Sequence, residues 1–252
     1  MSTNLARRAL TTARAGLLLL TCAGLAACGV LPPVADPVPT SVTPTALAVP
    51  SPATSSDLLS PDGFDAVQRM AVRIRNVGCG RLSTGSGFAL DPHTLVTNKH
   101  VVADSAQLQI STYDGHDLTA SATSTAELAD LALVRTDGEL PSWATLADTD
   151  PKVGDRITVV GYPEGRALTV TDGTVVATTT DPLNLSLGEV LVTDAPVEPG
   201  SSGSAALDAD GRVVGVVYAK SASGHSYLLP VSTLRQVLEQ ATFGPAPSCT
   251  TR

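Results

Sequence analysis

The sequence Glu-Pro-Gly-Ser-Ser-Gly-Ser-Ala-Ala occupies residues 198–206 and separates two mostly apolar runs, at 190–193 and 213–217. It predicts a tight turn between two strands, with Gly200 and Gly203 on either side of two serines. Because glycine lacks a Cβ, such a turn lets the backbone approach a bound group closely and can direct successive N–H groups at one point. The same composition is typical of an ordinary polar loop, so the rest of the chain has to distinguish the two interpretations.

The chain begins with a segment typical of an export signal. Arg7, Arg8 and Arg14 form a basic start without acidic residues, and the apolar stretch that follows is too short to span a membrane. The next residues, Leu-Ala-Ala-Cys at 25–28, resemble a bacterial lipobox. We therefore expect residues 1–27 to be a lipoprotein signal peptide.

Cleavage would make Cys28 the lipidated, palmitate-bearing N-terminus of an extracytoplasmic lipoprotein held at the cell membrane. Cys22 is a poorer candidate, because the bulkier Leu-Thr pair at 20–21 precedes it. Residues 28–62 are rich in Pro, Ala and Thr and show no amphipathic period, which predicts a disordered tether. The alternative is a plain secretory signal, with Cys28 unmodified and the protein secreted.

The charge of the chain restricts its partners. The 252 residues include 16 basic and 24 acidic side chains, for a net charge of −8. The signal holds three of the basic residues and none of the acidic ones, so 13 basic residues face 24 acidic ones in the mature chain, near −11. No basic cluster survives, so we expect neither a nucleic-acid partner nor attraction to anionic lipid.

Two cysteines remain in the predicted folded part, Cys79 and Cys249. The oxidising compartment implied by an export signal favours a disulfide between them, and two free thiols are the alternative. The chain has no CxxC pair and no His/Cys cluster, so we expect no zinc site or other metal site.

Short alternating or apolar runs predict an all-β fold of two six-stranded antiparallel β-barrels with a C-terminal helix. A single β-sandwich is the alternative. The expected strands of the first barrel (about 67–138) are 67–77, 86–90, 94–97, 107–111, 118–124 and 131–135. For the second (about 152–230), seven candidate segments supply about six strands: 156–161, 168–171, 173–178, 189–193, 204–207, 213–218 and 226–229. The helix is expected at about 231–241 with Ser232 as its N-cap, within a domain spanning 63–243 and followed by a tail at 244–252.

Three residues stand out for their chemistry. His100 follows a predicted strand at the start of a helical turn, and Asp130 directly precedes an apolar strand, where a partly buried carboxylate needs a donor. Ser202 lies in the glycine-flanked turn. A serine nucleophile needs a base, and that base needs a third group to fix its tautomer; histidine and aspartate satisfy these needs.

Together these segments resemble the trypsin-like (chymotrypsin-fold) serine proteases, with the bacterial HtrA/DegP-type protease domain as the closest branch. The resemblance covers roughly residues 68–238 and rests on Thr-Asn-Lys-His-Val-Val at 97–102, Asp-Leu-Ala-Leu-Val at 130–134, Gly-Tyr-Pro at 161–163, Thr-Asp-Ala at 193–195 and Pro-Gly-Ser-Ser-Gly-Ser at 199–204. It implies that His100 is the general base and acid, Asp130 its orienting carboxylate and Ser202 the nucleophile. The N–H groups of Gly200 and Ser202 would form the oxyanion hole.

The sequence departs from the family pattern in places. Ser204 stands where the family prefers a second glycine after the nucleophile, and it would either tighten the turn or be tolerated. Ser201 stands where animal digestive proteases carry an aspartate that pairs with a new N-terminus, so we expect no such activation. About ten residues follow the last helix, so we expect no PDZ module.

Specificity is predicted by analogy with the fold. Pro196, six residues before Ser202, falls near the base of the S1 pocket, and the absence of an acid there argues against a preference for Lys or Arg. His225 would lie on an S1 wall and favour an acidic P1 group; the alternative is a surface histidine on a loop. The segment from Ser221 to residue 224 would pair with the substrate backbone.

The sequence therefore predicts a serine endopeptidase that cleaves peptide bonds of a protein or peptide substrate through an acyl-enzyme, without a cofactor. One alternative is a non-catalytic binding or chaperone-like module on the same fold, suggested by Ser204. Another is an unrelated β-barrel whose motifs coincide by chance. Substrate identity and oligomeric state are not determined by the sequence.

Overall fold

The structure is a computed structural model that describes residues 64–126, 129–183, 188–246 and 249. The expected signal peptide, Cys28 and the tether lie outside the described residues, and their assignments stay predictions. None of the helices in the described ranges is long and apolar enough to cross a membrane.

Six strands form the first barrel. Their order is β5-β4-β1-β2-β3-β6, and β5 also pairs with β6, so the antiparallel ladder closes on itself. The elements of this half are α1 (Ala66–Arg69), β1 (Ala71–Gly78), β2 (Leu82–Asp91), β3 (Thr94–Thr97), α2 (Lys99–Val102), β4 (Ser105–Ser111), β5 (Asp117–Ala126) and β6 (Ala132–Thr136).

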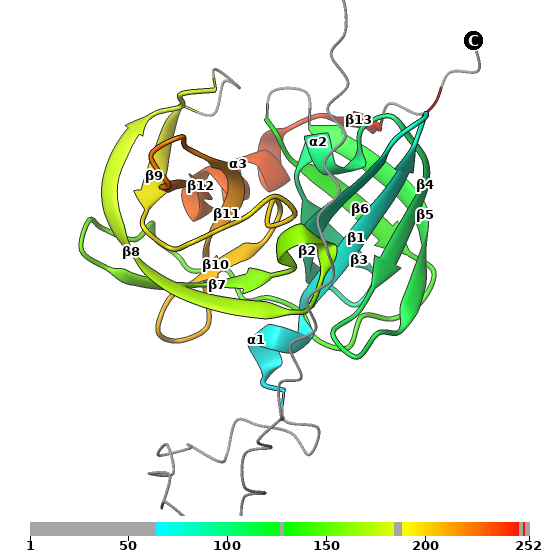
Figure 1. The fold of residues 1–252 in the computed structure, drawn as a ribbon, viewed down its shortest axis with the longest axis horizontal. Coiled ribbons are helices and arrows are strands. Elements are labelled where there is room, and N and C mark those ends of the chain that lie inside the picture. The colour runs from blue at the N-terminus through cyan, green and yellow to red at the C-terminus, as the bar shows by residue number, and fades with distance from the viewer. Residues whose placement is uncertain (1–63, 127–128, 184–187, 247–248, 250–252) are drawn as a thin grey trace, which may run out of the picture. The chain divides into compact units, whose positions relative to one another are not determined.

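Six further strands form the second barrel, closed in the order β10-β11-β12-β9-β8-β7. Figure 1 shows it to the left of the first barrel, with the helix α3 behind it. Its elements are β7 (Arg156–Gly161), the 3-10 turn η1 (Pro163–Gly165), β8 (Thr169–Thr180), β9 (Glu189–Thr193), β10 (Ala205–Leu207), β11 (Val213–Lys220), β12 (Ser226–Pro230) and α3 (Val231–Gln240). Two closed six-stranded antiparallel barrels confirm the predicted fold class and rule out the sandwich.

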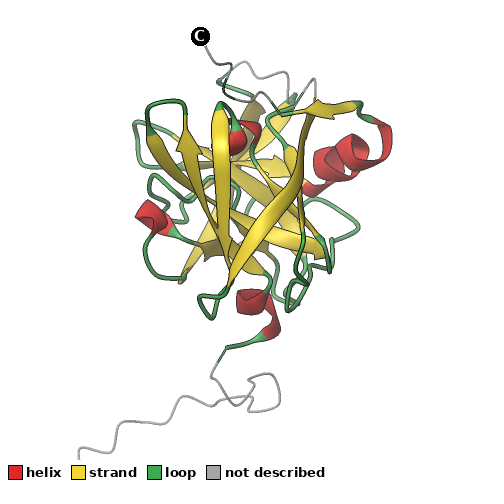
Figure 2. Cartoon of the chain, turned by 90° about the vertical axis from the view of Figure 1, so that its right-hand side faces the viewer, coloured by secondary structure: helices red, strands yellow, loops and turns green. Residues whose placement is uncertain are grey.

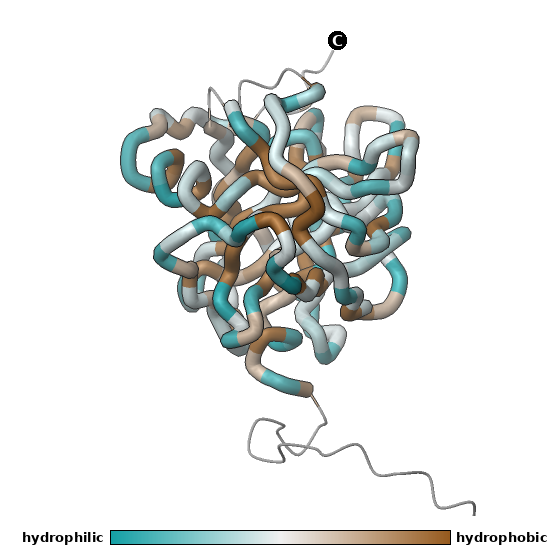
Figure 3. Tube along the Cα trace, turned by 90° about the vertical axis from the view of Figure 1, so that its left-hand side faces the viewer, coloured by the Kyte–Doolittle hydropathy of each residue, from teal (hydrophilic) through white to brown (hydrophobic). Residues whose placement is uncertain are grey.

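The alternation of inward-facing and outward-facing side chains along each strand produces the two cores. In β1, Ile74 is fully buried while its neighbours Arg73 and Arg75 face outward. The same period places Phe88 and Leu95 inside the first barrel, and the second is filled by a separate group of small aliphatic residues. Figure 2 shows strands making up nearly all of the regular structure, and Figure 3 shows hydrophobic segments inside and hydrophilic loops outside.

Two strand predictions are corrected by local geometry. The segment expected to be a strand from residue 67 starts as the helix α1, because Asp65 and Gln68 form a capping box with bonds of 2.8 and 3.0 Å. The two strands expected around Gly173 are one strand, β8. A Cβ at Gly173 would lie 2.4 Å from the backbone nitrogen of Ala195, in the segment after β9, so this glycine permits a close backbone approach within one continuous strand.

The predicted N-cap of the last helix is wrong by two residues. The helix α3 begins at Val231, and Ser232 is inside its first turn. The carboxylate of Asp150 caps it instead, accepting the Ser232 N–H at 2.8 Å and its hydroxyl at 2.5 Å. Sequence alone did not indicate this cap, because Asp150 lies 82 residues away.

The segment expected as a tail contains a further strand. After α3 the chain crosses back to the first barrel, where β13 (Phe243–Pro245) pairs with β5. Beyond it, Cys249 forms a disulfide with Cys79, which directly follows β1. The disulfide expected from the sequence is therefore present, and it attaches the C-terminal segment to the first barrel.

Candidate active site

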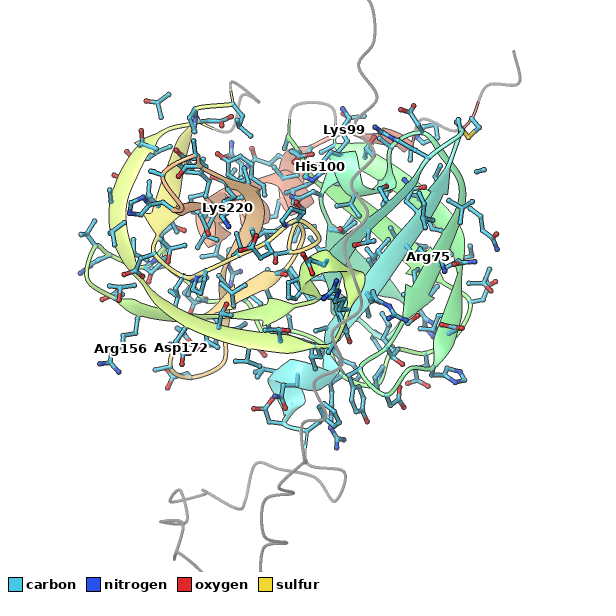
Figure 4. The ribbon with its side chains drawn as sticks, viewed as in Figure 1. Arg75, Lys99, His100, Arg156, Asp172 and Lys220 are labelled. Carbon is cyan, nitrogen blue, oxygen red and sulfur yellow. A yellow bond between two sulfur atoms is a disulfide. The ribbon has the colours of Figure 1, made fainter. Side chains whose placement is uncertain are left out.

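The pairing of two strands brings His100 next to Asp130. Strand β3 runs antiparallel to β6, with Thr97 opposite Ala132, so the end of β3 lies beside the start of β6. The Nδ1 atom of His100 lies 2.7 Å from Oδ2 of Asp130, and the backbone N–H of His100 donates to Oδ1 at 3.0 Å. Asp130 is buried while the His100 side chain is half exposed. Figure 4 places His100 on the side of the first barrel that faces the second.

Asn98 supports this pair, and the sequence analysis did not single it out. Its side chain is fully buried, and Nδ2 donates to the backbone carbonyl of Asp130 at 2.9 Å. The bond connects the residue before α2 to Asp130, which lies two residues before β6. The available signal was the position of Asn98 between the strand end and His100.

The turn at residues 198–204 is held by hydrogen bonds at each of its carbonyl groups from 199 to 202. The donors come from the turn itself, from β2 and from the η1 turn. The carbonyl of Pro199 accepts from the Glu164 N–H at 2.6 Å, that of Gly200 from Ser86 Oγ at 2.8 Å, that of Ser201 from the Ser204 N–H at 3.0 Å, and that of Ser202 from the Ser86 N–H at 2.8 Å.

The N–H groups of the same turn divide into two kinds. Those of Ser201 and Gly203 donate to backbone carbonyls at 2.9 and 2.8 Å, whereas those of Gly200 and Ser202 donate to no acceptor among the described residues. In a trans peptide the N–H points opposite to the preceding carbonyl, so these two N–H groups point away from Glu164 and Ser204. Two N–H groups without an acceptor in one turn are what an oxyanion hole requires, and the role of this pair stays a prediction.

Both glycines of the turn are needed by its geometry. Gly200 and Gly203 have φ angles of 97° and 88°, in the left-handed region that favours glycine. A Cβ at Gly203 would lie 2.1 Å from the carbonyl oxygen of Ser86, and one at Gly200 would lie 2.7 Å from the nitrogen of Glu164. The turn is therefore a close-approach turn and not an ordinary polar loop.

Ser204, the main departure from the family pattern, is accommodated. Among the described residues, the non-glycine positions with positive φ are Asp104 and Glu164, so the backbone at Ser204 does not call for glycine. Its side chain is fully buried, and Oγ has no hydrogen-bond partner in the described part of the chain. A Cβ at Gly161 would lie 1.8 Å from this Oγ, so the missing side chain of Gly161 provides the room.

The structure places Ser202 at the junction of the barrels without a direct bond to the histidine. Its carbonyl is tied to β2 of the first barrel through the Ser86 N–H. The hydrogen bonds among the described residues include none between Ser202 and His100. In proteases without substrate this contact is often long and tightens when substrate binds.

The specificity candidates lie apart from one another. Pro196 lines a small apolar cavity of about 180 Å3 behind the turn, together with Ser201 and Ser204, and neither Ser202 nor His225 lines it. His225 lies in the β11–β12 hairpin loop, where its carbonyl accepts from the Ser221 N–H at 2.7 Å. The roles of Pro196, Ser221 and His225 in substrate binding stay predictions.

Two buried tyrosines lie close to the turn. Burial raises the pKa of Tyr162 to about 12, and its hydroxyl has no partner among the described residues. Burial, followed by the 3.0 Å hydrogen bond to Asp181, raises the pKa of Tyr218 well above its usual value. Both stay neutral across the physiological range, so neither can serve as a base beside the turn. No group of three or more His, Cys, Asp or Glu side chains within the described ranges is arranged to hold a metal ion.

The two-barrel fold and the His–Asp pair beside a glycine turn define a trypsin-like architecture. The family model described as "Trypsin-like peptidase domain" matches residues 85–216, just over half of the chain, and the chain belongs to this family. The predicted resemblance is therefore confirmed at the level of the family.

The curated proteins to which the chain is similar include HtrA-like and DegP-like serine proteases. The "Serine protease Do-like HtrA" of Bacillus subtilis (strain 168) is 32% identical over 159 residues, which are 58% of this chain and 35% of that protein. A "Probable periplasmic serine endoprotease DegP-like" of Pseudomonas fluorescens is 32% identical over 169 residues, 64% of this chain and 36% of that protein. The chain thus spans about a third of the length of these relatives.

Solved structures show the same likeness. The active form of the Rv3671c protease from M. tuberculosis has a TM-score of 0.63 at 26% identity, over 74% of this chain and 88% of that one. The HtrA-type protease AlgW with a tripeptide has a TM-score of 0.62 at 28% identity, over 69% of this chain and 60% of that one.

Proposed function

We propose that the protein is a serine endopeptidase in which Ser202, His100 and Asp130 act as a catalytic triad. Ser202 Oγ attacks the carbonyl carbon of the scissile peptide, and its proton passes to Nε2 of His100. The resulting oxyanion accepts hydrogen bonds from the N–H groups of Gly200 and Ser202. The C–N bond then breaks, the leaving amine takes the proton from His100, and water repeats the sequence on the acyl-enzyme.

The observation that carries this proposal is the two-point contact between His100 and Asp130. One carboxylate oxygen accepts the backbone N–H at 3.0 Å and the other lies 2.7 Å from Nδ1. A buried carboxylate at Nδ1 favours the tautomer with hydrogen on Nδ1, which leaves the lone pair on Nε2. That lone pair is what a serine nucleophile needs.

The test is covalent labelling by a fluorophosphonate probe of the wild type, Ser202→Ala and Ser201→Ala. The adjacent serine is a matched control, because its N–H is bonded to the Glu198 carbonyl and its side chain lines the cavity behind the turn. We expect labelling of wild type and Ser201→Ala and none of Ser202→Ala. A folded wild type that does not label would favour the non-catalytic module, for which the absence of a Ser202–His100 bond is the supporting observation. Labelling lost in Ser201→Ala but retained in Ser202→Ala would refute the nucleophile assignment.

We further propose that the domain is exported and tethered by a lipid on Cys28. The periplasmic description of the DegP-like relative supports an extracytoplasmic location. Expressed with its own signal in a bacterial host, the wild type and Cys22→Ala are expected in the membrane fraction, and Cys28→Ala in the soluble extracytoplasmic fraction. Equal partitioning of all three would favour a plain secretory signal.

A further inference from the structure

One residue of the first barrel holds the turn that carries the oxyanion donors. Ser86 lies in β2, is fully buried and makes four hydrogen bonds. Its N–H donates to the Ser202 carbonyl and its Oγ to the Gly200 carbonyl, both at 2.8 Å. The same Oγ accepts the N–H of Tyr162 at 2.8 Å, and its carbonyl accepts the hydroxyl of Thr97 at 2.6 Å.

Ser86 thereby controls two peptide planes of the turn. The plane joining Gly200 to Ser201 lies between the two oxyanion donors, so its orientation sets the angle between them. Ser86 Oγ holds its carbonyl side, and the Glu198 carbonyl holds its N–H side at 2.9 Å. The Ser86 N–H holds a second carbonyl of the turn, that of Ser202, from the same strand.

The hydroxyl also joins two segments that both shape the site. A serine hydroxyl has one proton to donate and lone pairs to accept with, and here it donates to the nucleophile turn while it accepts from Tyr162, next to η1. The η1 residue Glu164 in turn donates to the Pro199 carbonyl and so sets the direction of the Gly200 N–H. An apolar side chain at 86 would leave the Gly200 carbonyl and the Tyr162 N–H without this partner.

We propose that Ser86 is a positioning residue for the oxyanion hole, and that its hydroxyl fixes the angle between the Gly200 and Ser202 donors. This inference rests on the proposed function. Ser86 does not touch the reacting atoms; it acts through the carbonyl groups on the far side of the turn. Its loss therefore affects the transition state, where negative charge develops on the oxyanion, more than it affects the bound substrate.

The test compares Ser86→Ala with Ser86→Thr, which keeps the hydroxyl, and with Ser202→Ala. The readouts are kcat and KM for p-nitrophenyl acetate, the inhibition constant of phenylboronic acid, which forms a tetrahedral adduct on a serine nucleophile, and the melting temperature. Thr136→Val is the matched control, because it removes a buried hydroxyl that donates to a backbone carbonyl at 2.7 Å, far from the turn.

We expect Ser86→Ala to lower kcat by about 10- to 100-fold with KM nearly unchanged. As kcat falls, the inhibition constant of phenylboronic acid should rise. Ser86→Thr should recover most of the lost kcat, and Thr136→Val should keep the wild-type kcat. If Ser86→Ala does not fold, Ser86→Cys, with a weaker donor of similar shape, is expected to show the same pattern more mildly.

Two results would overturn the role of Ser86 alone, given hydrolysis that depends on Ser202. One is Ser86→Ala with kcat and the inhibition constant within twofold of wild type. The other is a lower yield of active protein whose remaining molecules have unchanged kcat and inhibition constant, which would show a purely structural role. Hydrolysis that is absent in wild type, or survives Ser202→Ala, would instead overturn the proposed function and the role of Ser86 with it.

Discussion

Replacing Asp130 by asparagine tests the proposed triad at its most buried member. The carboxylate serves two donors of His100, the backbone N–H and the ring Nδ1. An amide side chain has a single acceptor oxygen. If that oxygen keeps the backbone N–H, the amide NH2 faces Nδ1, and the ring proton moves to Nε2, where it blocks proton transfer from Ser202.

The expected loss of kcat follows from this exchange of tautomers. The side chain keeps its shape, and the bond from Asn98 to the backbone carbonyl of Asp130 is unaffected, so the fold should persist. A triad base held in the wrong tautomer loses about 10⁴-fold in kcat, or roughly 5 kcal/mol of transition-state stabilisation.

The assay is hydrolysis of p-nitrophenyl acetate together with the rate of fluorophosphonate labelling, on protein whose folding is checked by circular dichroism. Asp155→Asn is the control, since that carboxylate also accepts a backbone N–H, from Lys152 at 2.8 Å, at an exposed turn remote from His100. A folded Asp130→Asn protein with kcat within tenfold of wild type would refute the orienting role of Asp130.

Four further predictions concern stability and specificity. Replacing Cys79 and Cys249 by serine should lower the free energy of unfolding by about 3–5 kcal/mol, measured by urea denaturation, because their disulfide closes a 170-residue separation; an unchanged midpoint would contradict this. Asp150→Ala should lower the free energy of unfolding by about 1 kcal/mol in the same urea assay, because it removes the cap of α3, whereas Asp150→Asn should retain most of the stability. Burial raises the pKa of Tyr162 from 10.0 to about 12, so its contribution to stability is complete below pH 10 and is lost as pH rises through 12. Tyr162→Phe should therefore flatten the fall of stability with pH in that range, and parallel curves would exclude the effect. His225→Ala should reduce cleavage after acidic P1 residues in a peptide library, and an unchanged profile would remove His225 from the specificity site.

The features predicted correctly are those that short stretches of chain encode. Alternating apolar residues indicated most strands, since one face of each strand packs into a barrel. The context of His100 and Asp130 indicated a pair because both follow or precede apolar strands. The error at β8 has a non-local cause: local composition predicts separate strands at 168–171 and 173–178, whereas Gly173 lies inside one strand and permits close contact with Ala195, in the segment after β9.

The supporting residues of the site could not be predicted from local sequence. Asn98 follows β3 and Ser86 lies within β2, and the local sequence does not show which group either side chain binds. Ser86 acts on a turn 114 residues away, and Asn98 on a carbonyl 32 residues away. Such bonds exist only after the barrels close, so no local pattern reports them.

Ser204 separates, at a single position, what the sequence determines from what the tertiary structure decides. The sequence alone specified a β-rich domain, its protease-like motifs and the glycine turn, because strand period and glycine placement are local properties. Folding of the chain decided whether Ser204 could be accepted, through the missing Cβ of Gly161. It also decided which N–H groups of the turn lack an acceptor and which carboxylate meets His100, because these depend on strands that lie far apart in the chain and meet only in three dimensions.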